Sequence, residues 1–329
     1  MEFHIGILPR QSVQHSLATA HAVEELGFAG VWIADSHSVM RDAYALLNVL
    51  AVQTRSIKLA AGVTPTGTRH PAVLANSWAT LDELSGGRAI LGVGTGDSAV
   101  INLGLRPEKL AAFEEKVKVI RALMRGEQVV YEGTKLEMPW SRCQVPIIMA
   151  CSGPKSLQLG GRIADGVLFQ VGADPAFVRY ALENIRKGAE SSGRGLQDLT
   201  LYMRLATAVN DDREKARREV RGYASVAAGT VFRTIPRAHF DDALWDDVER
   251  FKRGYDYTAH GSNRSRQAEL LTDRILDAIA VAGTPDEAVA RFRELAQLGM
   301  NGFVCPVGMD DPLPYLEVFA EKVVPKIMP

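Results

Sequence analysis

The sequence contains few cysteines, and none is spaced for a metal cage. Its 329 residues include only Cys143, Cys151 and Cys305, an odd number without a CxxC pair. A disulfide framework or a zinc site is therefore not expected. We predict reduced thiols in a cytoplasmic protein with no bound metal.

The net charge is close to zero, and long apolar runs are missing. The formal net charge is −1, which gives no basis for binding nucleic acid or an anionic membrane surface. The longest apolar runs have only the length of strands, so no transmembrane helix is expected. The N-terminal stretch MEFHIGILPR has no basic segment ahead of its apolar residues, and we therefore expect no signal peptide.

Several familiar catalytic motifs are missing as well. The chain contains no GxSxG, HExxH or P-loop sequence, so we expect neither a serine hydrolase, a zinc protease nor a P-loop nucleotidase. The stretch GVGTGDS is rich in glycine, but it does not match the Rossmann fingerprint.

The chain does contain eight short apolar runs separated by helical patterns. The runs are FHIGIL, GVWIAD, IKLAAGVT, AILGVG, PIIMACS, GVLFQVG, LYMRLATAV and GFVCPVG. They are apolar at nearly every residue, as is typical of parallel strands covered on both faces. One helical pattern, TPDEAVARFRELAQLG, opens with Thr284, Pro285 and Glu287, which is a capping box. Eight alternations predict an α/β protein with a (β/α)8 TIM barrel, a single domain over residues 1–329.

One interval is too long for this pattern. Residues 211–283, after the seventh strand, look largely helical and include the loop-like sequence AHGSNRSR. The segment also carries six aromatic residues: Phe232, Phe240, Trp245, Phe251, Tyr255 and Tyr257. We interpret it as a helical insertion that forms a lid over the barrel mouth. The alternative is a peripheral helical decoration.

Polar residues gather where the predicted strands end. Active sites of such barrels lie at the C-terminal ends of the strands. Strand two ends in Asp35, Ser36 and His37, strand three in GVTPTGTRH, strand four in GVGTGDS, strand five in ACSGPKS and strand six in Gln170. One polar strand end would indicate only a solvated loop. Five at one mouth predict the rim of a pocket.

Two of these strand ends are more specific. Ser152, Gly153 and Lys155 lie between a strand and a helix, where free backbone amides, a hydroxyl and an ammonium group favour a phosphate. An ordinary strand-to-helix turn is the alternative. Thr95 and Gly96 lie in the glycine-rich strand-four end, where the backbone can lie flat against a ring.

The assembled pattern resembles the bacterial luciferase-like superfamily of flavin and deazaflavin oxidoreductases, and within it the methylenetetrahydromethanopterin reductase branch. The matching segments, which extend over nearly the whole chain, are ELGFAGVWIADS, AAGVTPTGTRHP, LDELSGGRAILGVGTGD and PIIMACSGPKSLQLGGRIADGVL. The resemblance implies a cofactor ring across the barrel mouth and a phosphate near strands five and six. It also implies a homodimer, for which Trp78 and Leu81 would supply apolar surface.

The resemblance further implies a bulge with a non-proline cis peptide at Gly62–Val63, backing the cofactor ring. The predicted cofactor-binding residues are Gly62, Val63, Thr64, Thr95, Gly96, Ala150, Ser152, Gly153, Lys155 and Gln170. The predicted catalytic residues are Asp35, Asp97 and His70, with the two carboxylates orienting the substrate or relaying a proton. The alternative for each carboxylate is a structural cap on a loop.

Two departures from relatives that use coenzyme F420 bear on the cofactor. Ser36 stands where some of these dehydrogenases have a histidine, and His37 follows one position later. Ala173 stands where the sugar dehydrogenases have a lysine that meets the F420 phosphate. The anionic tail of F420 also needs an extended basic groove, which Arg233, Arg237 and Lys252 of the insertion could supply. We therefore predict FMN, with F420 as the alternative.

The predicted function is a two-component monooxygenase. It would receive reduced FMN from a separate flavin reductase and use O2 on a small organic substrate, in a dry cavity. The first alternative is an F420-dependent enzyme that transfers hydride to a C=N or C=C bond without oxygen. The second is a flavin-binding protein without catalysis, against which the long aromatic insertion argues.

Overall fold

The eight apolar runs form the eight parallel strands of a closed (β/α)8 barrel, as predicted. The structure is a computed structural model, and it describes residues 1–254 and 266–327. The barrel strands are β1 Glu2–Ile7, β2 Gly30–Ile33, β3 Lys58–Ala61, β5 Ala89–Gly94, β8 Ile147–Cys151, β9 Gly166–Phe169, β10 Thr200–Arg204 and β13 Gly302–Val307. Their hydrogen-bonded order is β3-β2-β1-β13-β10-β9-β8-β5, a β3–β5 pairing closes the ring, and the short strand β4 (Thr64–Pro65) adds to β5.

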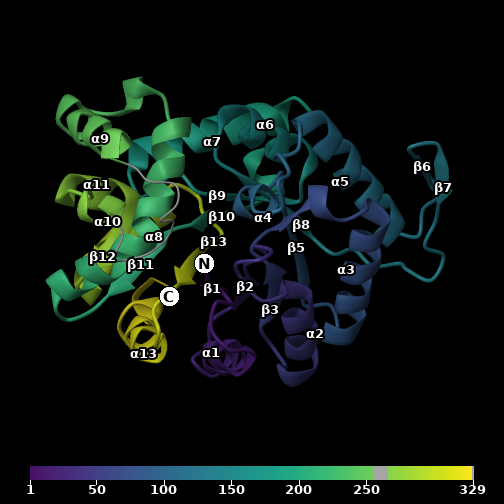
Figure 1. Ribbon diagram of the computed structural model, residues 1–329, viewed down its shortest axis with the longest axis horizontal. Coiled ribbons are helices and arrows are strands. Elements are labelled where there is room, and N and C mark those ends of the chain that lie inside the picture. The colour runs from purple at the N-terminus through teal and green to yellow at the C-terminus, as the bar shows by residue number, and fades with distance from the viewer. Residues whose placement is uncertain (255–265, 328–329) are drawn as a thin grey trace. The chain divides into compact units, whose positions relative to one another are not determined.

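Helices follow the strands along the chain (Figure 1). They are α1 Val13–Glu25, α2 Ala43–Gln53, α3 Pro71–Ser85, α4 Ser98–Ile101, α5 Leu110–Met124, α6 Pro154–Ile163, α7 Pro175–Glu190, α12 Pro285–Ala296, α13 Leu313–Lys322 and α14 Val324–Ile327. Short 3-10 helices are η1 Thr66–Thr68, η2 Leu196–Asp198 and η3 Arg237–His239. The predicted capping box is confirmed, since Thr284 and Glu287 bond each other's backbone at the start of α12.

The described residues fall into two compact units, and each is treated by itself. The N-terminal unit comprises Ile5–Ala150 and Ile163–Val167, and the C-terminal unit comprises Met1–His4, Cys151–Arg162 and Leu168–Pro329. Over the described ranges, no helix has the length and apolar character needed to cross a bilayer. Over the same ranges, no three His, Cys, Asp or Glu side chains gather as a metal site would require.

In the N-terminal unit, α3 packs against both α2 and α5. Trp78 and Leu81 of α3 are buried by these contacts within the chain. They therefore offer no exposed apolar surface, and this motive for a homodimer is wrong. A hairpin that the sequence analysis did not expect, β6 Val129–Tyr131 and β7 Thr134–Leu136, projects from this unit (Figure 1).

In the C-terminal unit, the predicted seventh strand divides in two. Its first half, β10, belongs to the barrel sheet, whereas its second half, β11 (Ala206–Val209), pairs in parallel with β12 (Ala280–Gly283). The last four residues of the segment 211–283 are therefore a strand and not part of a helix. Because Ala, Val and Gly suit a buried strand as well as a helix end, the pattern alone did not separate the two.

The remainder of the insertion is helical where it is described. Its helices are α8 Arg213–Thr234, α9 Asp242–Gly254, α10 Arg266–Glu269 and α11 Asp273–Ile279. The ring of Phe232 lies 5.6 Å from that of Phe251 and 6.0 Å from that of Phe240, so these helices share an apolar core. Tyr255, Tyr257 and nearly all of AHGSNRSR lie outside the described residues, and the lid role remains a prediction.

Candidate active site

The end of strand three carries the predicted bulge. Leu59 pairs with Ala89, but Thr64 pairs with Val93, so β3–β4 contains one more residue than β5 over the same span. An extra residue in one of two paired strands is the definition of a β-bulge. The peptide bond Gly62–Val63 within it is cis. The predicted bulge and its cis peptide are both confirmed.

Glycines on β5 leave space for this bulge. A Cβ atom at Gly92 would lie 2.0 Å from the carbonyl oxygen of Ala61, and one at Gly94 would lie 3.0 Å from Val63 Cγ2. Any larger residue would therefore push the bulge away from β5. The glycines of the AILGVG run allow two strand ends to approach closely.

A buried carboxylate at the end of β2 holds the bulge from the other side. Asp35 Oδ2 accepts hydrogen bonds from Thr64 Oγ1 at 2.8 Å and from the Arg69 guanidinium at 3.1 Å. The positive charge of Arg69 offsets the cost of burying the carboxylate. Two of the predicted site residues, Asp35 and Thr64, are thus joined directly, and Arg69, from the GVTPTGTRH end of strand three, completes the group.

Tyr44 of α2 extends this group and was not found from the sequence. Its hydroxyl lies 2.8 Å from Thr64 Oγ1, and its ring stacks under the Arg69 guanidinium at 4.0 Å. Burial raises the pKa of Tyr44 to about 12. The phenol therefore stays protonated at neutral pH and donates to Thr64, which in turn donates to Asp35.

His37 faces the other oxygen of the same carboxylate. Its Nδ1 lies 3.4 Å from Asp35 Oδ1, and its Nε2 lies 3.3 Å from Thr68 Oγ1. The His37 side chain is 20% exposed, compared with 2% for Asp35. Although this histidine follows Asp35 by two positions, the chain still brings its imidazole to the carboxylate.

The two other predicted catalytic residues lie outside this group. His70 is exposed and caps α3, where its Nδ1 accepts from the Ala72 amide at 3.2 Å. Asp97 is exposed just before α4, and its backbone carbonyl accepts the amides of Val100 and Ile101. His70 thus caps a helix with its side chain, whereas Asp97 occupies an N-cap position without a side-chain capping hydrogen bond. The catalytic roles of both remain predictions.

The remaining predicted residues of the N-terminal unit line the end of β5. The Thr95 carbonyl accepts the Glu108 amide at 2.9 Å, which closes the loop between them. Gly96 has φ +98°, and a Cβ atom there would lie 2.6 Å from Val100. Ala150 follows on the neighbouring strand β8, and its Cβ would lie 3.8 Å from a Cβ at Gly94.

In the C-terminal unit, the predicted phosphate residues lie at the start of α6. Ser152 and Gly153 precede Pro154, the first residue of this helix, and the Lys155 side chain is exposed. The first amides of a helix have no acceptor within it, so the donor set suits a phosphate. Any such binding remains a prediction.

Gln170 contacts the insertion. Its Oε1 accepts from the Tyr223 hydroxyl of α8 at 3.0 Å, and Arg204 at the end of β10 lies 5.5 Å from the Tyr223 ring centroid. Burial raises the pKa of Tyr223. Tyr223 and Arg204 had no signal in the sequence, because each stands alone in an otherwise ordinary helix or strand.

The basic residues considered for an F420 tail are largely paired. Arg237 and Lys252 lie over the Trp245 ring, at 5.1 and 4.4 Å from its centroid. Arg237 also forms an ion pair with Asp242, and Lys252 forms one with Glu249 at 3.5 Å. Their role toward a cofactor remains a prediction.

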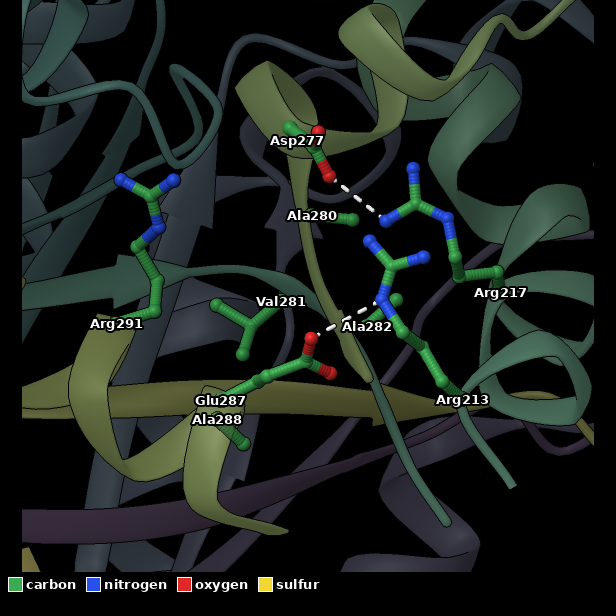
Figure 2. A pocket seen from close by; sticks show the side chains of 9 residues that line it. All are labelled: Arg213, Arg217, Asp277, Ala280, Val281, Ala282, Glu287, Ala288 and Arg291. Carbon is green, nitrogen blue, oxygen red and sulfur yellow. Dashed lines mark hydrogen bonds and ion pairs between the residues drawn. The ribbon is translucent and has the colours of Figure 1, made fainter. Parts of the chain in front are cut away.

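A pocket in the C-terminal unit is lined by other residues (Figure 2). The Arg213 and Arg217 side chains lie side by side there, paired with Glu287 at 3.0 Å and Asp277 at 2.7 Å respectively. Each of these two guanidinium groups already has a carboxylate partner, and Arg291, the third arginine of the lining, pairs with Glu294 at 2.8 Å. None of the predicted site residues lines it.

Comparison with known proteins connects this geometry to a family. The Luciferase-like monooxygenase family model matches residues 1–302. The chain is 34% identical to a 5,10-methylenetetrahydromethanopterin reductase of Methanolobus tindarius, over 94% of this chain and 95% of that one. It is 30% identical to an F420-dependent glucose-6-phosphate dehydrogenase of Nakamurella multipartita, over 94% and 91%.

A solved structure agrees in fold. The coenzyme F420-dependent tetrahydromethanopterin reductase of Methanopyrus kandleri superposes with a TM-score of 0.81 at 24% identity, covering 99% of both chains. The family match covers most of the chain and includes the strand-three bulge, the Asp35 group and the start of α6. The protein is therefore a member of the luciferase-like monooxygenase family, a family of oxidoreductases.

Proposed function

We propose that this enzyme is an F420-dependent oxidoreductase that exchanges hydride with a C=N or C=C bond of an organic substrate. This reverses the order of the two cofactors in the sequence analysis, which favoured FMN. The support comes from the relatives, because one 30% identical over most of the chain and the superposed reductase both carry F420 in their names. For the choice between F420 and FMN, we give the similarity over most of the chain more weight than the two departures at Ser36 and Ala173.

The residues present suit such a cofactor. When bound, a deazaflavin would supply the hydride from its C5 position. In the N-terminal unit, the bulge at Gly62–Val63 and the polar group behind it would support the ring. In the C-terminal unit, Ser152, Gly153 and Lys155 would hold a phosphate. Phosphate is common to F420 and FMN, so this donor set fits either.

The observation that carries the chemical proposal is the pairing of Asp35 with His37. Hydride transfer requires a group that takes up or releases a proton. Asp35 Oδ2 is occupied by Thr64 and Arg69, whereas His37 is partly exposed and lies against Oδ1. We assign the proton to the His37 imidazole, with Asp35 orienting the ring through Nδ1.

Anaerobic titration with F420 and with FMN tests the cofactor assignment. We expect F420 to bind at least about tenfold more tightly, a difference of about 1.4 kcal/mol. Reduced F420 with an iminium-type substrate should then regain the visible absorbance of the oxidised deazaflavin without oxygen. Tighter binding of FMN, with O2 consumption when a flavin reductase is supplied, would instead establish the monooxygenase function.

A further inference from the structure

We infer that Glu108 is a positioning residue that holds two strand-end loops together, an inference about cofactor binding that rests on the proposed function. The first is the bulge loop, residues 62–68, and the second is the glycine loop, residues 95–108. Both belong to the N-terminal unit. Thr66 belongs to the polar end of strand three, whereas neither Glu108 nor Lys116 stood out in the sequence.

Glu108 contacts the bulge loop through its carboxylate. Thr66 Oγ1 donates a hydrogen bond to Glu108 Oε2, and Lys116 of α5 forms an ion pair with Oε1. Lys116 Nζ also donates to the Thr66 carbonyl at 3.1 Å. Thr66 is fully buried, so its hydroxyl depends on this carboxylate as an acceptor.

Glu108 also closes the glycine loop through its backbone. Its amide donates to the Thr95 carbonyl at 2.9 Å, so the first and last residues of that loop are joined. Glu108 therefore closes the glycine loop with its backbone amide and binds the bulge loop with its carboxylate. Lys116 adds a third point, because α5 is a rigid element.

This arrangement controls where Thr64 and Val63 lie. Thr64 is bound to Asp35 on one side, and Thr66, two residues later, is bound to Glu108 on the other. Val63 comes just before Thr64 and lies against Gly94, the residue that precedes the glycine loop. Loss of the Glu108 carboxylate should remove the only side-chain acceptor described for Thr66 and leave the bulge loop held by Asp35, by its pairing with β5 and by Lys116. The weaker attachment would allow the loop to shift relative to Thr95 and Gly96.

The first test follows the two loops without any cofactor. In Glu108→Gln, hydrogen–deuterium exchange should become faster in both loops, because the charged contact to Lys116 is lost. Glu114→Gln is the matched control: Glu114 lies on α5, the helix of Lys116, and is paired with Lys118 at 2.7 Å. Its side chain is 16% exposed, compared with 14% for Glu108. Unchanged exchange in Glu108→Gln, or equal changes in both variants, would overturn the inference.

The second test measures binding. Glu108→Gln and Thr66→Val should each raise the Kd for the cofactor about tenfold, as the loss of a charge-assisted hydrogen bond would. KM for the cofactor should rise with little change in kcat at saturation, and Thr66→Ser, which keeps the hydroxyl, should restore binding. A fall in kcat with unchanged KM would contradict positioning. If the wild type bound no F420, the proposed function would fail, and the exchange experiment would still decide this inference.

Discussion

The two oxygens of Asp35 serve different partners. Oδ2 is saturated by a hydroxyl and a guanidinium, so it fixes the carboxylate in place. Oδ1 faces His37, the more exposed of the pair. His70, in contrast, uses Nδ1 to cap a helix. At the scale of single residues, the structure therefore distinguishes His37, which faces the buried carboxylate, from His70, which caps a helix.

We expect His37→Asn to lower kcat by about 10²–10⁴-fold, the usual contribution of a positioned acid or base. His70→Asn should leave kcat nearly unchanged, because asparagine is itself a good N-cap. Steady-state kinetics of the two variants checks this, with thermal unfolding to show that both are folded. A large loss of kcat in His70→Asn alone would return the catalytic role to His70.

At the scale of secondary-structure elements, a single carboxylate can likewise connect a helix to the turn before a strand. Glu24, in the last turn of α1, accepts the amides of Arg55, Ser56 and Ile57 in the turn before β3. Burial acts to raise the pKa of Glu24, but these hydrogen bonds outweigh it and lower the pKa from 4.5 to about 2. The contact therefore fastens a helix to the strand that leads into the bulge.

The sign of this shift predicts a loss of stability in acid. Because the folded-state pKa is the lower one, the contribution is complete above pH 4.5 and disappears as the pH falls toward about 2. Glu24→Gln should reduce the free energy of unfolding at pH 7 by about 1 kcal/mol, since the site is partly exposed. Glu25→Gln, one residue later and exposed, is the control. Equal urea denaturation midpoints for the two variants would contradict the assignment.

At the scale of the whole molecule, the barrel was predictable because its eight strands are apolar on both faces. The bulge was predictable because a family resemblance and Gly62 coincided at one position. The connections of Glu108, Tyr44 and Tyr223 were not, because they join residues far apart in sequence that carry no local pattern. Burial of Trp78 and Leu81 was missed for a related reason: an amphipathic helix does not reveal what covers it.

A homodimer remains our prediction, but we now expect its interface on exposed residues of α2 and α3 and not at Trp78 and Leu81. Exposed apolar residues occur on α2 and α3, including Val49, Val52, Val73 and Leu84, and these two helices are in contact. Val52 is 67% exposed, so Val52→Asp should convert the dimer to monomer, as measured by sedimentation at micromolar concentration. Val130→Asp on the hairpin, at 70% exposure, should not. Dissociation by Val130→Asp alone would place the interface at the hairpin.

Because β11 pairs with β12, the insertion begins and ends at two adjacent strands. Val209 lies beside Gly283, and the Asn210 amide donates to the Gly283 carbonyl at 3.1 Å. A path between two parallel strands needs about a dozen residues, and each doubling of its length costs only about 0.6 kcal/mol. Evolution can therefore lengthen, shorten or replace the excursion between these strands at little cost in stability. If the insertion is the predicted lid, substrate specificity can change in evolution without changes in the residues at the strand ends.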